Sequence, residues 1–482
     1  MSYFQAPYPP YDPTDKSGYE TVVKRWPVIL TTVIDNIHRT NHDVTLSGNK
    51  DTGALADRND SLEGLDENAK ERVAEGKHLI ELVSKLKYEM GRDRPLVQIP
   101  DDGESGVEDY NTELRKLTEE ENGTWFTAPW LFAECYLYRL LRAWFAQTKH
   151  WRDHDPFFAS KEDSFKGSSD AVFKLASTMR DLEARKDELE ADHEKIGVLF
   201  KEMIQMSLWY DLSLLTNLTQ EDIRKLQSVG NDAHAERKEF VLRDDADAVW
   251  SHLRTMRDGR ADFVLDNSGF ELYTDLVFAD FLVTYTPYVS KVVFHPKAMP
   301  WFVSDVTPPD FKHTFSSILS PSFFPPPSPT SPSTNSASDL HHMVTRWKTH
   351  LSTGAFSLSV PVDTPLGASN LQTDFWTAPH AYWDMKLRAA ELFEALSGSG
   401  LVIFKVTFSC LLTGDVRWPA STPFETAIGP LSGAFPILSL RTSKADVVVG
   451  VDQAKADALD ASGEKWRVNG KYALVSFCPR KS

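Results

Sequence analysis

The feature that most constrains the fold of this chain is a series of short apolar runs that alternate with helical patterns in its second half. Helical patterns lie between these runs, at 270–285 and 385–396. Near-continuous apolar strands separated by helices are typical of parallel sheets with both faces covered. The second half is therefore predicted to be an α/β fold with a largely parallel sheet. The runs assigned as strands are 261–265 (ADFVL), 291–295 (KVVFH), 401–404 (LVIF), 447–451 (VVVGV) and 473–477 (ALVSF).

The first half of the chain has the periodicity of helices instead. Apolar residues recur at helical spacing between Leu79 and Met90, and Gly91 can end that helix. The run 130–145 is almost wholly apolar and aromatic, and the stripes within 172–182 and 195–215 repeat the helical pattern. These stripes indicate packing between helices rather than a ligand site.

The change of pattern predicts two domains. We expect an all-helical N-terminal domain over 1–240 and an α/β domain over 241–482. The segment 320–338 consists almost entirely of Ser, Pro and Thr, with two Phe residues near its start. Because such a segment cannot bury enough apolar surface to offset its chain entropy, we predict a disordered insertion there.

The acidic composition limits the partners of the chain. It has 69 Asp and Glu residues against 52 Lys and Arg residues, and a formal net charge of −17. A surface of this sign repels nucleic acid and anionic lipid, so neither is an expected partner. It also repels a phosphorylated substrate. A phosphate site must therefore have local positive charge from a metal or from placed Lys and Arg.

The sequence gives no sign of export or membrane insertion. Residues 1–12 lack the basic and apolar regions of a signal peptide, and no stretch reaches the roughly 18 apolar residues of a membrane span. The three cysteines, Cys135, Cys410 and Cys478, are far apart, which indicates neither a zinc cluster nor a disulfide framework. A reducing compartment fits best, so we expect a cytoplasmic or nuclear protein.

Polar side chains follow two of the predicted strands. Asp266 and Asn267 come directly after 261–265, and Gly269 allows a sharp turn into the next helix. Asp305 follows the strand 291–295. Ligands of open α/β sheets bind beyond the carboxyl ends of the strands, and two carboxylates with one carboxamide make a hard oxygen site. Taken alone, residues of this kind are more often helix caps or turn residues than metal ligands.

The same residues lie in longer stretches that resemble the damage-control phosphatase family, formerly a domain of unknown function. DNSGFELYTDLVFADFL at 266–282 resembles the family signature. RWPVILTTVID from Arg25, TWFTAPWLFAECYLYR at 124–139 and FHPKAMPWFVSDVTPPDF at 294–311 resemble its third subfamily. RTSK at 441–444 matches the RTxK motif of that subfamily. The resemblance runs from about residue 18 to 478, apart from the Pro-rich insertion.

The resemblance implies a fold and a chemistry. The fold is a helical N-terminal domain on a Rossmann-like α/β/α sandwich. Asp266, Asn267 and Asp305 are implied as ligands of a divalent metal, Mn²⁺ first, with Co²⁺, Ni²⁺ or Mg²⁺ as alternatives. The implied reaction is hydrolysis of fructose 1-phosphate, fructose 6-phosphate and related reactive sugar phosphates, with Lys444 at the phosphate and Glu271 in the same pocket.

One segment departs from the family. After the strand the family has GlyAspLeuAsnTyrArgLys, which supplies Asn and Arg to the phosphate. Here 405–411 reads KVTFSCL before LTGD resumes the match. The change is either a misassigned splice junction or a genuine loss of phosphate donors. As written, the chain is expected to bind metal and to turn over poorly.

Two other functions remain open. In the animal relative the glutamate that matches Glu271 is assigned to S-adenosylmethionine binding, which suggests a carboxyl methyltransferase. No GxGxG loop follows a strand here, which argues against a conventional methyltransferase site. The third alternative is a non-catalytic interaction protein. His295 and Lys297 lie close to a strand end; His295 fits a structural role better, although both could assist catalysis. The protein partners are not predicted.

Overall fold

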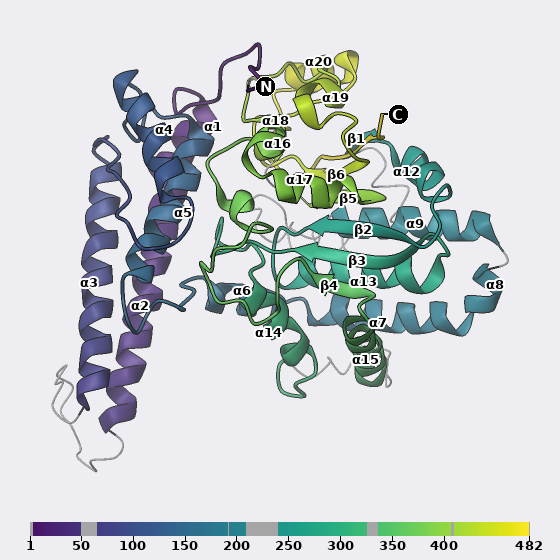
Figure 1. Ribbon diagram of the computed structural model, residues 1–482, viewed down its shortest axis with the longest axis horizontal. Helices are drawn as coiled ribbons and strands as arrows, with labels where there is room; N and C mark the ends of the chain where they lie inside the picture. The colour runs from purple at the N-terminus through teal and green to yellow at the C-terminus, as the bar shows by residue number, and fades with distance from the viewer. Residues whose placement is uncertain are drawn as a thin grey trace.

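The computed structural model describes residues 3–49, 65–190, 192–208, 240–324, 336–405 and 409–481. Within these ranges its centre is a sheet in the order β1-β7-β6-β5-β2-β3-β4 (Figure 1). Every neighbouring pair is parallel except β6 and β7. The predicted largely parallel sheet is therefore confirmed. The strands are β1 (Val241–Asp244), β2 (Gly259–Val264), β3 (Val289–His295), β4 (Phe356–Leu358), β5 (Leu401–Lys405), β6 (Ile437–Thr442) and β7 (Ala473–Cys478).

The predicted strands agree with the sheet in all but one case. The runs 261–265, 291–295, 401–404 and 473–477 correspond to β2, β3, β5 and β7. The run 447–451 is not a strand. Its valines are buried, but the N–H groups of Gly450 and Val451 donate to the carbonyls of Thr422 and Ala420 in a loop. The apolar run thus predicted burial correctly, but its backbone pairs with a loop and not with a strand of the sheet.

Helices cover both faces of the sheet. The side chains of β5 alternate between two cores, with Leu401 and Ile403 in one and Val402 and Phe404 in the other. This alternation is what a strand buried on both faces requires. The later helices are α12 (Ala246–Leu253), α13 (Phe270–Tyr285), α14 (Pro308–Ile318), α15 (Ser336–Thr353), α16 (Met385–Arg388), α17 (Ala390–Ser397), α18 (Ser409–Thr413), α19 (Phe424–Ala427) and α20 (Gln453–Ala461).

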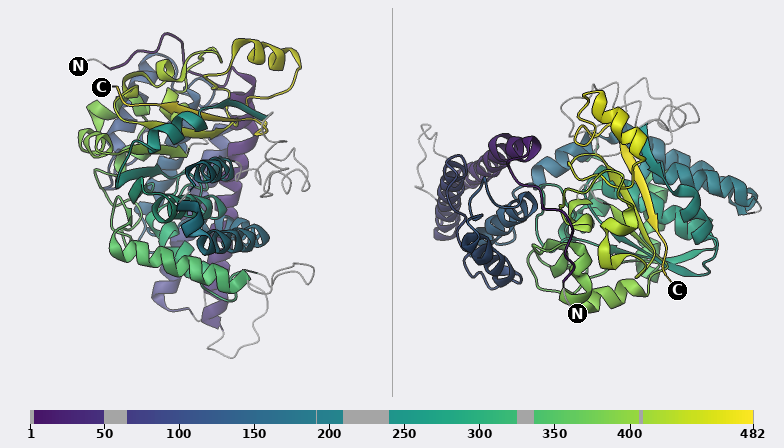
Figure 2. Two further views of the ribbon diagram at one scale, coloured as in Figure 1. Left: turned by 90° about the vertical axis from the view of Figure 1, so that its right-hand side faces the viewer. Right: turned by 90° about the horizontal axis from the view of Figure 1, so that it is seen from above.

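The helices of the first half form two groups. The long hairpin of α2 and α3 stands beside the sheet, with α4 and α5 next to it (Figures 1 and 2). The helices α7 and α9 share one core with the sheet, and α2, α3 and α5 share another core with side chains of β2, β5 and β6. The 1–240 and 241–482 boundary stays a prediction, since packing joins α7 and α9 to the strands. The early helices are α1 (Lys16–Glu20), η1 (Thr21–Arg25), α2 (Trp26–Asn49), α3 (Glu67–Met90), α4 (Val107–Glu119), α5 (Trp130–Ala146), α6 (Phe158–Lys166), α7 (Ser169–Ala184), α8 (Lys186–Glu190) and α9 (His193–Leu208).

The remaining predictions on secondary structure hold with small changes. The predicted helix at 385–396 is broken at Ala389, whose φ of −141° is not helical. The prediction of disorder over 320–338 is wrong at both ends, because Phe324 is buried against Phe165 and α15 begins at Ser336. Residues 325–335 lie outside the described residues. In the described ranges, no helix combines the length and apolarity that crossing a bilayer requires.

Candidate metal centre

The candidate site begins where β2 ends. The N–H of Leu265 donates to the carbonyl of His295 at 3.1 Å, which keeps the chain beside β3 for one more residue. Asp266 and Asn267 follow and are both buried. Gly269 then starts α13 at a φ of +71°, and a Cβ at this position would lie 3.2 Å from the Cβ of Phe165. A glycine therefore suits this turn on both conformational and steric grounds.

The segment around Asp305 runs directly beside Asp266 and Asn267. Asn267 and Asp305 form an isolated antiparallel bridge. The N–H of Ser268 donates to the carbonyl of Ser304 at 2.6 Å, and the N–H of Val306 donates to that of Asp266 at 2.8 Å. The structure thus brings the three predicted metal ligands together, as expected for neighbouring strand ends. Their roles remain predictions.

Of the three predicted ligands, Asp305 has the most unusual environment for a carboxylate. It is 1% exposed, and its Oδ1 has no hydrogen-bond partner among the described residues. Its Oδ2 lies 3.2 Å from the Nζ of Lys297. Burial nevertheless raises the pKa of the carboxyl to about 6. A buried carboxylate oxygen without a partner is costly, and a divalent cation would relieve that cost. The residues present therefore fit a metal.

Asn267 is held by hydrogen bonds on both ends of its side-chain amide. Its Nδ2 donates to Oδ2 of Asp266 at 3.2 Å and to Oε2 of Glu271 at 2.7 Å. The hydroxyl of Ser304 donates to its Oδ1. An amide oxygen has two lone pairs, so it can accept from a hydroxyl and coordinate a cation at the same time.

A buried ionic network lies behind Glu271, and sequence reasoning missed it. The Nζ of Lys405 lies 3.2 Å from Oε1 of Glu271 and 3.0 Å from Oδ1 of Asp275, and it donates to Oγ of Ser207 at 2.8 Å. Burial raises the pKa of Asp275 to about 7. Burial opposes the charge on Lys405, but Asp275 and Glu271 outweigh it and raise the Lys405 pKa. The signal in the sequence was a set of three carboxylates, Glu271, Asp275 and Asp280, in a helix that is otherwise mostly apolar.

Lys444 lies at the same edge of the sheet. It follows β6, which is parallel to β5, and β5 is parallel to β2. The carboxyl ends of these strands therefore share one edge. Lys444 is half-buried, and burial together with Arg25 lowers its pKa to about 7. Arg25 comes from η1 and lies 3.3 Å from the fully buried carboxylate of Glu134.

Comparison with known proteins identifies the family. Residues 21–459 match the family described as the damage-control phosphatase ARMT1-like domain. The chain belongs to the damage-control phosphatase family. Proteins named damage-control phosphatase ARMT1 are similar along nearly their whole length. The Danio rerio protein is 33% identical over 476 residues, which cover 95% of this chain and 94% of the relative. The proteins of Mus musculus and Homo sapiens are 31% and 29% identical, again over 95% of this chain and over 95% and 96% of the relatives.

Solved structures give a much weaker similarity. A DUF89 family protein from Pyrococcus horikoshii covers 78% of this chain and 90% of its own, at 13% identity and a TM-score of 0.36. This score is too low to support an argument about the site.

The departure from the damage-control phosphatase pattern falls at the end of β5. The strand extends to Lys405, and α18 begins at Ser409. Residues 406–408, which form part of the changed segment 405–411, lie outside the described residues. The predicted loss of phosphate donors therefore remains a prediction.

Other side chains near the centre are already paired. His295 lies 2.8 Å from the carboxylate of Asp262, and both side chains are buried, which favours a structural role for this histidine. Among the described side chains, no three of His, Cys, Asp or Glu are grouped closely enough to hold a metal. The ligand set that the damage-control phosphatase resemblance implies contains two carboxylates and one carboxamide, so it depends on Asn267 as a third ligand.

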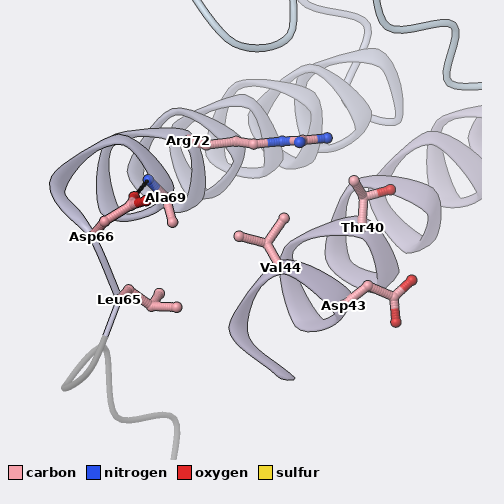
Figure 3. Close-up of a pocket in the computed structure, with 7 residues that line it drawn as sticks. All are labelled: Thr40, Asp43, Val44, Leu65, Asp66, Ala69 and Arg72. Atoms are coloured by element: carbon pink, nitrogen blue, oxygen red, sulfur yellow. Dashed lines mark hydrogen bonds between the residues drawn. The ribbon is translucent and has the colours of Figure 1, made fainter. Parts of the chain in front are cut away.

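A separate pocket lies far from this centre. Thr40, Asp43 and Val44 of α2 face Ala69 and Arg72 of α3 across it, near the free end of the hairpin (Figures 1 and 3). None of the predicted ligands of the damage-control phosphatase site lines it. It adds nothing to the chemistry at the sheet edge.

Proposed function

We propose that this chain is a metal-dependent phosphoric monoester hydrolase that acts on small sugar phosphates such as fructose 1-phosphate and fructose 6-phosphate. Asp266, Asn267 and Asp305 would hold the divalent cation, with Mn²⁺ as the first choice. The observation that carries this proposal is the buried Oδ1 of Asp305, which has no hydrogen-bond partner among the described residues, beside Asp266 and Asn267. The names of the relatives support phosphatase chemistry in general terms.

A cation bound there supplies positive charge that draws electron density from the phosphoryl oxygens. The residues of the chain provide the rest. The ammonium group of Lys297 lies 3.2 Å from the Asp305 carboxylate and offsets part of its negative charge. Lys444 would bind the phosphate as a compact ammonium charge at the same edge of the sheet. Together these cations meet the requirement for local positive charge on a protein of net charge −17.

The arrangement of Glu271 favours hydrolysis over methyl transfer. Its two carboxylate oxygens are engaged, one with the Asn267 amide at 2.7 Å and the other with the Lys405 ammonium at 3.2 Å. A carboxylate held in this way orients Asn267 for a cation. If it instead bound S-adenosylmethionine, both contacts would compete with that ligand. Calorimetry with S-adenosylmethionine tests this alternative, and we expect no binding heat.

The proposed function is tested by phosphate release from fructose 1-phosphate with and without Mn²⁺. Asp266→Ala should abolish the Mn²⁺-dependent part and the rise in melting temperature that Mn²⁺ produces. Asp363→Ala is the matched control, because Asp363 is an exposed carboxylate paired with Lys312. Metal-independent activity, or full activity in Asp266→Ala, would overturn the proposal.

The altered segment after β5 should weaken turnover rather than metal binding. A lost charge-assisted contact from an arginine is worth about 1.5–3 kcal/mol per hydrogen bond. If the contact forms mainly in the transition state, each 1.36 kcal/mol lowers the rate about tenfold. Replacing 406–411 with the family sequence GlyAspLeuAsnTyrArgLys, so that Lys405 is retained, should raise kcat. No gain in sugar-phosphate hydrolysis would refute this account.

A further inference from the structure

A buried lysine from the N-terminal helices holds the segment that carries Asp305. Lys161 lies in α6, and its side chain is 4% exposed. Its Nζ donates to the main-chain carbonyl of Asp305 at 3.1 Å, to Oδ2 of Asp155 at 2.8 Å and to Oδ2 of Asp310 at 2.8 Å. An ammonium group has three donors, so these contacts use all of them. Burying a charged side chain in this way is costly unless it is fully paired.

The partners of Lys161 lie on both sides of the segment. Asp310 belongs to the first turn of α14, where its Oδ2 accepts from the N–H of Thr307 at 2.9 Å and from the Thr307 hydroxyl at 2.7 Å. Asp155 lies before α6, and its Oδ1 accepts from the N–H of Phe157 at 2.8 Å. Lys161 therefore joins the start of α6, the start of α14 and the backbone of Asp305 at a single atom.

The Asp305 segment needs such support because its backbone is unusual. Phe302 and Val303 have φ values of 44° and 75°, in the left-handed region that residues with a Cβ rarely adopt. The ring of Tyr138 in α5 packs on Phe302 with a centroid distance of 5.2 Å. A segment held in this conformation relaxes if its contacts are lost, and the position of the Asp305 carboxylate would change with it.

We propose that Lys161 is a positioning residue for the metal centre: it fixes the main chain of Asp305 so that the carboxylate faces Asp266 and Asn267. This inference rests on the proposed function, since it assumes that Asp305 binds the cation. It differs from the role of Lys297, whose Nζ lies 3.2 Å from the Asp305 carboxylate itself. Lys161 contacts the main-chain carbonyl of Asp305, whereas Lys297 contacts its carboxylate.

The test is Mn²⁺ titration of chelator-treated full-length protein by calorimetry. Lys161→Met should weaken Mn²⁺ binding on the order of 10–100-fold, the usual cost of losing a group that orients a metal ligand. Arg346→Met is the control, because Arg346 also neutralises a buried carboxylate. Its guanidinium lies 2.5 Å from Oδ2 of Asp280, which belongs to α13. The control should lose stability and keep the wild-type Mn²⁺ affinity.

Because Lys161→Met leaves two buried carboxylates without their cation, Lys161→Arg is the second variant. It keeps the positive charge, but a planar guanidinium cannot direct its donors as an ammonium does, so Mn²⁺ affinity should fall several-fold with little change in melting temperature. Hydrogen exchange should speed up in peptides covering 301–307 and not in α15. If either variant folds and binds Mn²⁺ with wild-type affinity, the inference about Lys161 is overturned and the proposed function is not affected. Failure of the wild-type chain to bind Mn²⁺ overturns the proposed function as well.

Discussion

Replacing Asp275 by asparagine should stabilise the protein at neutral pH. Asp275 is fully buried in α13, its Oδ2 has no hydrogen-bond partner among the described residues, and its Oδ1 accepts from Ser207 at 3.0 Å. Burial raises its pKa from the ordinary 3.8 to about 7. Below about pH 7 the neutral form of the side chain is thus the favoured one in the folded protein. Asparagine reproduces that neutral form, and its Oδ1 can keep the contacts with Ser207 and Lys405.

The size and the pH range of the effect follow from the two pKa values. A raised folded-state pKa means that stability present below pH 3.8 is lost progressively as the pH rises to about 7. At 1.36 kcal/mol per pH unit, the loss amounts to about 4 kcal/mol. Lys405 stays charged over this range, because its pKa is raised from 10.5, and in the variant Glu271 remains as its buried counter-charge at 3.2 Å. With an unfolding entropy of about 2 cal/mol/K per residue, a chain of 482 residues that unfolds as one unit gains about 4 °C.

The measurement is the melting temperature of Asp275→Asn and of the wild type between pH 5 and pH 8, in the presence of a chelator. The gain should grow over this range and level off above pH 7. Asp280→Asn is the matched control in the same helix. Burial disfavours the charge on Asp280, but His350 and Arg346 outweigh it and lower the Asp280 pKa, so this variant should be destabilised equally at both pH values. An Asp275→Asn gain that does not grow with pH would refute the reasoning.

Two further predictions concern the edge of the sheet. Lys444→Met should raise KM for sugar phosphates at least about tenfold without changing Mn²⁺ affinity. The wild-type KM should rise above pH 7, because the pKa of Lys444 is lowered to about 7 and the neutral amine binds phosphate weakly. Steady-state kinetics at pH 6 and pH 8 measure both effects, and an unchanged KM contradicts the phosphate role. Val303→Gly should raise the free energy of unfolding by about 1 kcal/mol, because its φ of 75° suits glycine; urea denaturation measures this change, and a loss of stability would show that the packing of Val303 outweighs the strain.

The sequence predicted those helices and strands whose pattern of apolar residues agrees with their burial in the fold. The run before Asp266 and the helical pattern from Phe270 to Tyr285 coincide with β2 and α13, because both are buried along nearly their whole length. The strand β6 was missed. Ser439 and Arg441 interrupt its apolar pattern, although the whole strand is buried. The strand β4 has only three residues, which is too short for a pattern.

Long-range pairing explains most of what sequence could not predict. The run 447–451 looked like a strand, but the place beside β6 is taken by β7, which arrives later in the chain and runs antiparallel. Lys161 lies in the charged stretch FASKEDSFK, which resembles a solvated helix. Its partners Asp305 and Asp310 lie 144 and 149 residues away, so no local pattern shows their contact. The positions of Asp266 and Asp305 after predicted strands singled them out, and the family resemblance implied their role as ligands. Only the fold reveals what holds them in place.

The packing of α7 and α9 against the sheet has a consequence for synthesis of the protein. These helices leave the ribosome before any strand of the sheet, and the last strand, β7, ends at Cys478, far beyond Leu208 at the end of α9. At translation rates of about 5–20 residues per second, the delay is roughly 15–50 seconds. During that time the apolar faces of both helices have no sheet to cover, so the nascent chain should depend on chaperones more than its final stability suggests.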